Sequence, residues 1–331
     1  MSKNQFGLVY ANAISENQQG KVSIHPVAYM LNGIRIAANV YTPADYDAMG
    51  VKKYPAVTVA HPNGGVKEQV AGLFAEKLAE MGYVTIAADA AYQGESEGTP
   101  RQRDYPENRV NDICGMVDFL MSLSYVDPDR IASLGICGGG GYTLAAAQID
   151  KRIKAVATLS MFNTGRVRRN GFLDGDKANI QTRLRKAADA RIKEQSGEVL
   201  YEGDNPPMTE SEIRGLMEKL PAGLYRDGVE YYGITHAHPN STSRYTTESL
   251  MHLMAFDVDD RMELIDQPLL MMAGDIADTK YMTDSAFEKT VNAKSKELFL
   301  IEGATHIRTY LVPEYVEKAT GKLKQFFAEN L

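Results

Sequence analysis

The stretch Ile131-Ala-Ser-Leu-Gly-Ile-Cys-Gly-Gly-Gly-Gly-Tyr-Thr-Leu-Ala145 decides how the rest of the chain is interpreted. A short apolar run leads to Cys137, and the residues after it are typical of a helix. Gly135-Ile-Cys-Gly-Gly139 fits the nucleophile-elbow pattern Gly-x-Ser-x-Gly, with sulfur in place of the hydroxyl. A sharp strand-to-helix turn strains the nucleophile backbone, and glycines at 135 and 139 let the two arms approach. A phosphate-binding loop is the weaker interpretation, because the Lys-Ser/Thr of a P-loop is missing.

The elbow also predicts the state of the sulfur. Cys137 would lie at a helix N-terminus, where free N–H groups and the helix dipole favour a thiolate. The second cysteine, Cys114, falls on the apolar stripe of a predicted helix that includes Val110, Ile113 and Val117. We therefore expect Cys114 to be a small core residue and Cys137 to be the reactive thiol.

Composition sets limits on the class of protein. With 331 residues and 44% hydrophobic content, the chain can bury the core of one large α/β domain, with or without an insertion. The net charge of -7 makes nucleic acid an unfavourable partner. No stretch approaches about 18 continuous apolar residues, so no membrane segment is expected and a cytoplasmic protein is the simplest interpretation. Two cysteines without a shared motif do not indicate a disulfide framework or a zinc site.

Strands alternate with helices on both sides of the elbow. An Asn-Gly pair at 32–33 predicts a hairpin of the strands at 22–29 and 34–41. Apolar residues at helical spacing predict helices near 70–81, 110–121 and 283–292, and a last helix after 313. This order predicts an α/β fold with a mostly parallel sheet covered on both faces. The remaining strands are expected at 54–60, 83–88, 131–136, 153–159, 268–273 and 297–301.

Residues 163–262 interrupt the alternation. This block is polar and helix-rich, and Thr209-Glu-Ser-Glu212 before an apolar run is a capping box that begins a short helix. We expect a core domain of residues 20–162 and 263–331, with 163–262 inserted as a helical lid over the carboxyl ends of the strands.

His306 is the predicted general base, because Gly303-Ala-Thr-His306 directly follows the last sheet strand. His25 and His252 are expected to be structural. His236 and His238 form an H-x-H pair without a third ligand, so we predict no metal site.

The acid should follow the strand that ends near Ala273, where Asp275 and Asp278 are both available. We predict Asp278, because four residues beyond Gly274 give the loop room to turn; Asp275 remains the alternative, otherwise capping the loop. The oxyanion donors should be the backbone N–H groups of Gly138 and Asn63, since Pro62 has none. Gly64 and Gly65 would permit close approach of the backbone to substrate, while His61 should only buttress this loop.

The chain resembles the dienelactone-hydrolase-related branch of the α/β-hydrolase superfamily. The matching motifs are Gly65-Val-Lys-Glu-Gln69, Asp89-Ala-Ala-Tyr-Gln-Gly-Glu-Ser96, Gly135-Ile-Cys-Gly-Gly-Gly-Gly-Tyr142, Ala273-Gly-Asp-Ile-Ala-Asp-Thr279 and Gly303-Ala-Thr-His306. The resemblance implies an α/β-hydrolase fold and a Cys–His–Asp triad of Cys137, His306 and Asp278. We expect Gly64, Tyr92, Tyr142 and Arg166 to contact substrate, although a solvated face is the alternative for Arg166, Arg168 and Arg169.

A cysteine nucleophile forms a thioester intermediate, which suits activated acyl groups. The predicted function is therefore hydrolysis of a small-molecule enol lactone, thioester or small ester without a cofactor. Acyl transfer to an acceptor other than water and non-catalytic ligand binding are the alternatives. The sequence names neither the acyl group nor the oligomeric state, for which a homodimer is one alternative.

Overall fold

The chain folds around one eight-stranded sheet with the strand order β1-β2-β4-β3-β5-β6-β9-β10. This is a computed structural model, and it describes residues 4–203 and 207–331. Strand β2 pairs antiparallel with both β1 and β4, whereas all later pairs are parallel. The strands are β1 (Ser23–Leu31), β2 (Ile34–Thr42), β3 (Tyr54–Ala60), β4 (Val84–Ala88), β5 (Val126–Ile136), β6 (Ala155–Leu159), β9 (Leu269–Gly274) and β10 (Lys296–Ile301).

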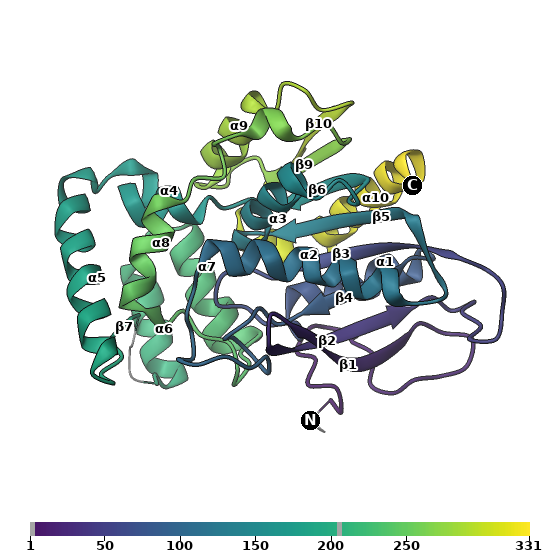
Figure 1. The fold of residues 1–331 in the computed structure, drawn as a ribbon, viewed down its shortest axis with the longest axis horizontal. Helices are drawn as coiled ribbons and strands as arrows, with labels where there is room; N and C mark the ends of the chain where they lie inside the picture. Colours follow the sequence, from purple (N-terminus) through teal and green to yellow (C-terminus); the bar gives the residue numbers. More distant parts are fainter. Residues whose placement is uncertain (1–3, 204–206) are drawn as a thin grey trace.

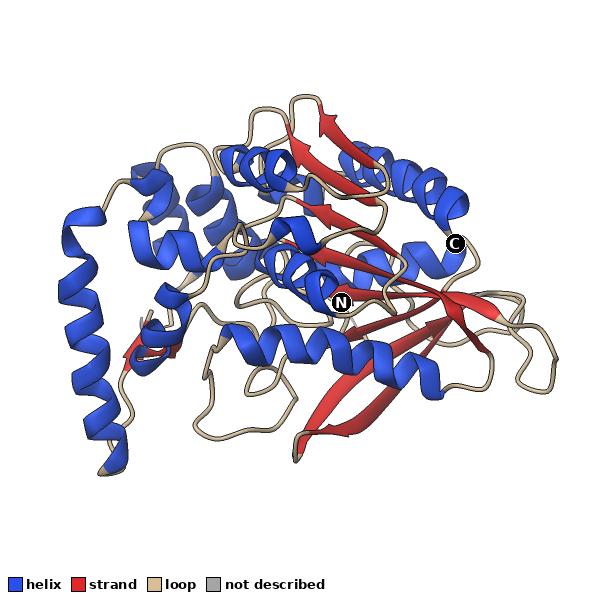
Figure 2. Cartoon of the chain, turned by 45° about the horizontal axis from the view of Figure 1, so that its top comes forward, coloured by secondary structure: helices blue, strands red, loops and turns tan. Residues whose placement is uncertain are grey.

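Helices cover both faces of this sheet, as Figure 2 shows. Helix α1 (Val70–Glu80) and helix α10 (Pro313–Asn330) contact each other, while α2 (Pro106–Ser122) packs against α3 (Gly138–Ile149) and the central strands. In α1, the fully buried residues Val70, Phe74 and Leu78 recur every four positions and form the stripe that faces the sheet. The predicted α/β-hydrolase fold is confirmed, with helix α9 (Lys280–Lys289) packed beside β9.

The register brings the functional loops to one edge of the sheet. Gly135 of β5 lies opposite Ala60 of β3, and Ile136 lies opposite Leu159 of β6. Strand β9 ends at Gly274, which lies opposite Ile301 of β10. Because these strands are parallel, their carboxyl ends meet at the same edge, and the loops carrying Asn63, Cys137, Asp278 and His306 all begin there.

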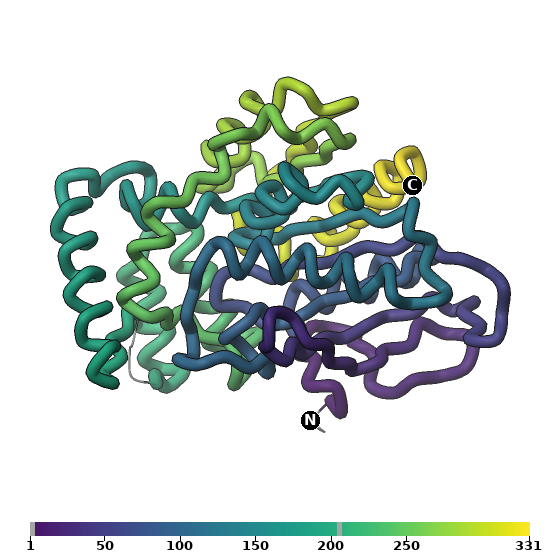
Figure 3. Tube along the Cα trace, in the orientation of Figure 1, coloured from purple at the N-terminus to yellow at the C-terminus, as the bar shows by residue number. Residues whose placement is uncertain are grey.

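Residues 163–262, called the insertion from here on, form a separate group of helices at that edge (Figure 1). The helices are α4 (Thr164–Asn170), α5 (Ile180–Gln195), α6 (Glu210–Lys219), α7 (Leu224–Glu230) and α8 (Leu250–Ala255). The short strands β7 (Tyr201–Glu202) and β8 (Tyr245–Thr246) pair with each other and not with the main sheet. Figure 3 shows that the C-terminal helix, drawn in yellow, lies on the side away from α5.

Most element boundaries agree with the sequence predictions. The hairpin turns at Asn32 and Gly33, and the capping box of α6 is made by the Thr209 and Glu212 side chains. The helix predicted from 283 begins earlier, at Lys280, because the turn after β9 leads directly into it. Among the described residues, every helix is too short or too polar to cross a lipid bilayer.

Candidate active site

Cys137 occupies a strained turn between β5 and α3, with φ 56° and ψ −123°. A non-glycine residue in such a conformation costs about 1–3 kcal/mol, and the surroundings hold it. Its N–H donates to the Leu159 carbonyl at 3.0 Å. A Cβ on Gly135 would lie 2.4 Å from the Gly139 oxygen, and one on Gly139 would lie 2.5 Å from the Ala60 oxygen. The two glycines are therefore required by the close approach expected from the sequence.

Cys137 is buried, with 8% of the residue exposed. Burial raises the pKa of the thiol, while hydrogen bonding with the Tyr310 hydroxyl and with the backbone N–H groups of Gly138 and Asn63 lowers it in part. Burial outweighs these donors, so the pKa of the Cys137 thiol lies above its ordinary value. The direction of this shift runs against the thiolate expected at the helix N-terminus, which stays a prediction.

His306 is linked to this sulfur through the hydroxyl of Tyr310. Its Nε2 is 2.8 Å from the Tyr310 hydroxyl, which is itself a hydrogen-bond partner of Cys137. Its Nδ1 is 2.6 Å from the Thr279 hydroxyl. The histidine is fully buried, and burial lowers its pKa to about 3. A polar chain thus runs from Cys137 through Tyr310 and His306 to Thr279.

Asp278 does not make the contact with His306 that the sequence predicted. Its Oδ2 accepts the backbone N–H of Leu224 at 2.9 Å, at the beginning of helix α7. Burial raises the pKa of this carboxyl, and the Leu224 N–H opposes the shift. Both ring nitrogens of His306 are taken by hydroxyl groups, and no hydrogen bond or ion pair within residues 4–203 and 207–331 joins the two residues. The alternative, Asp275, caps its loop by accepting the Gly303 N–H at 2.7 Å.

The loop after β3 brings Asn63 against the residue that follows the nucleophile. A Cβ on Gly138 would lie 2.1 Å from Asn63 Oδ1, so glycine is required for this contact. The Asn63 side chain donates to the Thr164 hydroxyl at 2.8 Å. His61 buttresses the loop as expected: its Nε2 accepts the Ala90 N–H at 3.1 Å, and burial lowers its pKa to about 4.

The insertion reaches this site through several polar contacts. The Gly64 carbonyl accepts the Thr242 N–H at 3.0 Å and the Ser241 hydroxyl at 2.7 Å. The Thr305 hydroxyl donates to Asp227 of α7 at 2.6 Å. The ring of Tyr231 packs edge-on against Tyr310, with centroids 5.7 Å apart. The insertion therefore contacts the oxyanion loop at Gly64, the chain neighbour of His306 at Thr305, and the partner of the nucleophile at Tyr310.

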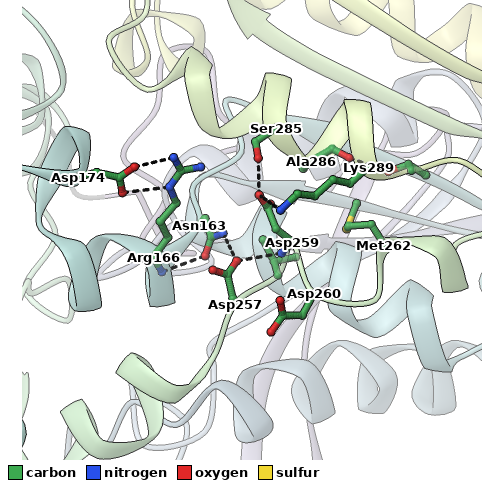
Figure 4. A network of polar contacts seen from close by, with 12 residues as sticks. Asn163, Arg166, Asp174, Asp257, Asp259, Asp260, Met262, Ser285, Ala286 and Lys289 are labelled. Atoms are coloured by element: carbon green, nitrogen blue, oxygen red, sulfur yellow. Dashed lines mark hydrogen bonds and ion pairs between the residues drawn. The ribbon is translucent and has the colours of Figure 1, made fainter. Parts of the chain in front are cut away.

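Three of the residues predicted to contact substrate make other contacts within the protein. Arg166 is held by Asp174 through two hydrogen bonds of 3.1 and 2.6 Å, as Figure 4 shows. Tyr142 is fully buried on α3, with the Arg109 guanidinium 5.0 Å from its ring centroid. Tyr92 has a positive φ and packs against Gly98, where a Cβ would lie 2.4 Å from its ring. That Arg166, Tyr142 and Tyr92 contact substrate stays a prediction, and these contacts within the protein do not support it.

Tyr310 and Thr279 are the site residues that the sequence interpretation missed. Tyr310 lies four residues after His306, at the end of the short 3-10 helix Ile307–Tyr310. This turn places the two rings against each other, with centroids 5.7 Å apart. Thr279 directly follows Asp278. Residues four apart lie on the same side of a helical turn, so the spacing of His306 and Tyr310 could have indicated their contact. The sequence interpretation did not predict a helical turn at this place.

One group of acidic side chains has the spacing of a cation site. Within the described residues, Glu68, Asp89 and Glu95 bring three carboxylates together. The Lys67 ammonium lies among them, 2.5, 3.0 and 2.8 Å from their oxygens, and it supplies the positive charge that they require. His236 stacks on Tyr231, with the ring centroids 4.4 Å apart.

Comparison with known proteins agrees with the α/β-hydrolase fold. The model of the dienelactone hydrolase family matches residues 36–162. The uncharacterised protein YcjY of Escherichia coli K12 is 38% identical over 90% of this chain and 95% of its own length. The crystal structure of the hypothetical protein PA2218 from Pseudomonas aeruginosa superposes with a TM-score of 0.80 at 30% identity, covering 94% of each chain. The thiohydrolase aneE of Aspergillus aculeatus is 30% identical over 129 residues, 39% of this chain and 38% of that protein.

The chain belongs to the dienelactone hydrolase family, and it is an α/β-hydrolase enzyme. The resemblance inferred from the five motifs is thereby confirmed.

Proposed function

We propose that this enzyme hydrolyses activated acyl compounds, namely thioesters, enol lactones or small esters, through an acyl-Cys137 intermediate. The observation that carries the proposal is the environment of one sulfur atom. Cys137 is held at the elbow with two backbone N–H groups and the Tyr310 hydroxyl as its hydrogen-bond partners, and Tyr310 in turn is hydrogen-bonded to His306. The name of the related thiohydrolase supports the same chemistry.

In the proposed first step, the Cys137 sulfur attacks the acyl carbonyl carbon. Its proton passes to the Tyr310 oxygen as Tyr310 gives its own proton to His306 Nε2. Backbone N–H groups of Gly138 and Asn63 stabilise the negative charge that develops on the carbonyl oxygen. The bond to the leaving group then breaks, and the leaving thiol or alcohol takes the proton from His306.

The second step releases the acyl group. Water attacks the thioester carbonyl while His306 accepts one of its protons, and the Cys137 sulfur leaves and recovers that proton. A neutral imidazole is needed to start both steps, and the low pKa of His306 keeps it neutral. Thr279 can accept the Nδ1 proton and hold the ring, but its hydroxyl carries no charge to stabilise an imidazolium.

We further propose that the insertion is a lid. Its contacts at Gly64, at Thr305 and with Tyr310 reach the oxyanion loop, the neighbour of His306 and the partner of the sulfur, where the insertion could exclude water from the acyl-enzyme.

Intact-mass measurement after mixing with an aryl thioester tests the proposal. Wild-type protein should gain one acyl group, and Cys137→Ala should gain none and lose on the order of 10⁴-fold or more in turnover. Cys114→Ala is the matched control, because that thiol lies on α2 beside Asp150 and should be dispensable. Turnover by folded Cys137→Ala at the wild-type rate would refute covalent catalysis by this residue. Products formed with added thiols or alcohols would identify acyl transfer instead of hydrolysis.

A further inference from the structure

Arg109 of helix α2 contacts both segments that carry the proposed oxyanion donors. Its Nη2 donates to the His61 carbonyl at 3.1 Å, two residues before Asn63. Its guanidinium lies over the ring of Tyr142, 5.0 Å from the centroid and four residues after Gly138. The residue is 4% exposed. One buried side chain thus joins the loop after β3 to the helix that follows the nucleophile.

The carbonyl that Arg109 binds lies against the elbow itself. A Cβ on Gly139 would be 2.6 Å from the His61 oxygen, so this oxygen touches the first turn of α3. The backbone N–H groups of Gly138 and Asn63 are both partners of the Cys137 sulfur. Their spacing depends on how the loop sits on this turn, and the hydrogen bond from Arg109 holds the loop there.

The charge of Arg109 is only loosely neutralised by the protein. The Asp104 carboxylate is 3.9 Å from its Nη1, an ion pair without a hydrogen bond, and Nη1 has no hydrogen-bond partner among the described residues. Burial raises the pKa of Asp112, one turn further along α2, to about 7, and its carboxyl accepts a backbone N–H at 3.0 Å. Arg166, by contrast, makes two hydrogen bonds with Asp174. A buried cation is costly unless it is well paired, so the charge of Arg109 remains available to a negative group that forms nearby.

Such a group forms at the reaction centre. Burial raises the pKa of the Cys137 thiol, and the positive charge of Arg109 is among the influences that oppose it. The other titratable side chains around the sulfur are neutral at pH 7. Burial raises the pKa of Tyr310 and Tyr232 well above the ordinary value, and it lowers the pKa of His306 to about 3. Arg109 is therefore a fixed positive charge at a site where thiolate and oxyanion character develop.

We propose that Arg109 is a positioning residue for acyl transfer, which holds the N–H groups of Gly138 and Asn63 at their spacing and offers a fixed positive charge to the sulfur and the carbonyl oxygen as they become negative. The inference rests on the proposed acyl-cysteine chemistry. Arg109 acts through His61 and Tyr142 and not by contact with substrate. Because its contribution grows as negative charge develops, it lowers the barrier without tightening substrate binding.

Arg109→Met removes the charge from a side chain of similar bulk. It should lower kcat for an aryl thioester by about 10²-fold, the usual cost of losing an oxyanion donor, with KM within about threefold. The pH profile of Cys137 alkylation by iodoacetamide should move upward by about one pH unit, because a nearby opposite charge favours the thiolate. A purely structural role of Arg109 would not move that profile in the folded protein. Arg109→Lys, which keeps the charge and loses the planar fork, should keep the wild-type profile and recover only part of kcat.

Arg103→Met is the matched control. Arg103 lies six residues earlier, pairs with Glu194 of α5 and lies over the Tyr105 ring. Because these contacts are with residues away from the elbow, this variant should keep the wild-type kcat and the wild-type alkylation profile.

A folded Arg109→Met protein that keeps either the wild-type kcat or the wild-type alkylation profile would overturn the inference. If Arg109→Met does not fold, Arg109→Lys decides: a kcat lowered about tenfold with an unchanged profile supports the inference, and a wild-type kcat or a moved profile overturns it.

Intact-mass measurement separates this inference from the proposed function. Wild-type protein that never gains an acyl group at Cys137 would refute the acyl-cysteine step, whereas alkylation needs no substrate and would still report the effect of Arg109 on the sulfur. Acylation of wild type and of Arg109→Met at the same rate would refute the role of Arg109 alone.

Discussion

Replacing Tyr310 by phenylalanine removes a single oxygen from between the nucleophile and the base. That oxygen is 2.8 Å from His306 Nε2, and it is also a partner of the Cys137 thiol. The residue is 1% exposed and the ring is retained, so no cavity forms. The folded protein should lose about 1–3 kcal/mol of stability, because a buried nitrogen is left without its partner.

The effect on acylation should be larger. If Tyr310 passes the thiol proton to His306, its removal should slow the acylation step by about 10² to 10⁴-fold, the usual contribution of positioned proton transfer. This corresponds to about 3–5 kcal/mol in the barrier. Single-turnover release of an aryl thiol, followed by stopped flow, measures this step directly.

Tyr315→Phe is the matched control for that experiment. Its hydroxyl donates to the Gly303 carbonyl at 3.0 Å, near the same loop but away from the sulfur. It should lose a comparable hydrogen bond and acylate at the wild-type rate. If folded Tyr310→Phe acylates as fast as wild type, the relay is wrong, and His306 must reach Cys137 directly after Tyr310 moves aside.

Four further outcomes follow from the same geometry. Asp278→Asn should keep kcat within about tenfold, because the Asp278 carboxylate accepts the Leu224 N–H. Thr279→Val should lower kcat more, because Thr279 contacts His306. A loss near 10⁴-fold in Asp278→Asn would show that Asp278 is the acid of the triad after all. Steady-state kcat/KM should show no acid limb near pH 6.5, since burial lowers the pKa of His306 to about 3. For the same reason the unfolded chain binds more protons, so the contributions of His61 and His306 to stability are complete above about pH 6.5 and decline as pH falls, which chemical denaturation at several pH values measures. Iodoacetamide should label Cys137 before Cys114, whose thiol pKa is raised to about 12 by burial and by Asp150; peptide mapping that finds Cys114 first would contradict this.

The parts of the site that the sequence predicted are those fixed by local pattern. Glycines on both sides of Cys137 are required by backbone contacts within the elbow and with the neighbouring strand, so the motif itself specified the turn. The place of His306 followed from parallel strands ending at a common edge. Both depend on short-range geometry that repeats wherever the pattern occurs.

The predicted contact between Asp278 and His306 is absent because the partner of Asp278 is distant in the chain. Asp278 accepts the N–H of Leu224, which lies 54 positions earlier in the insertion, and nothing in the loop from Ala273 to Thr279 reveals that contact. The arginines of α4 show the same limit. Residues two apart on a helix point in different directions, and only the packed positions of Asp174 and Tyr245 distinguish Arg166 from Arg168.

The fastening of helix α7 has a consequence for how mutants of this enzyme should be interpreted. Its two anchors are Asp278 and Thr305, and each is the immediate chain neighbour of a residue in the polar chain, Thr279 or His306. A substitution that loosens α7 would therefore displace the histidine without touching a reacting atom. In a genetic screen scored by growth or colour, such a variant would be indistinguishable from loss of the nucleophile. Intact-mass measurement at long reaction times would distinguish them: with a displaced histidine both steps slow but the sulfur remains, so the acyl-enzyme still forms, whereas without the nucleophile it never forms.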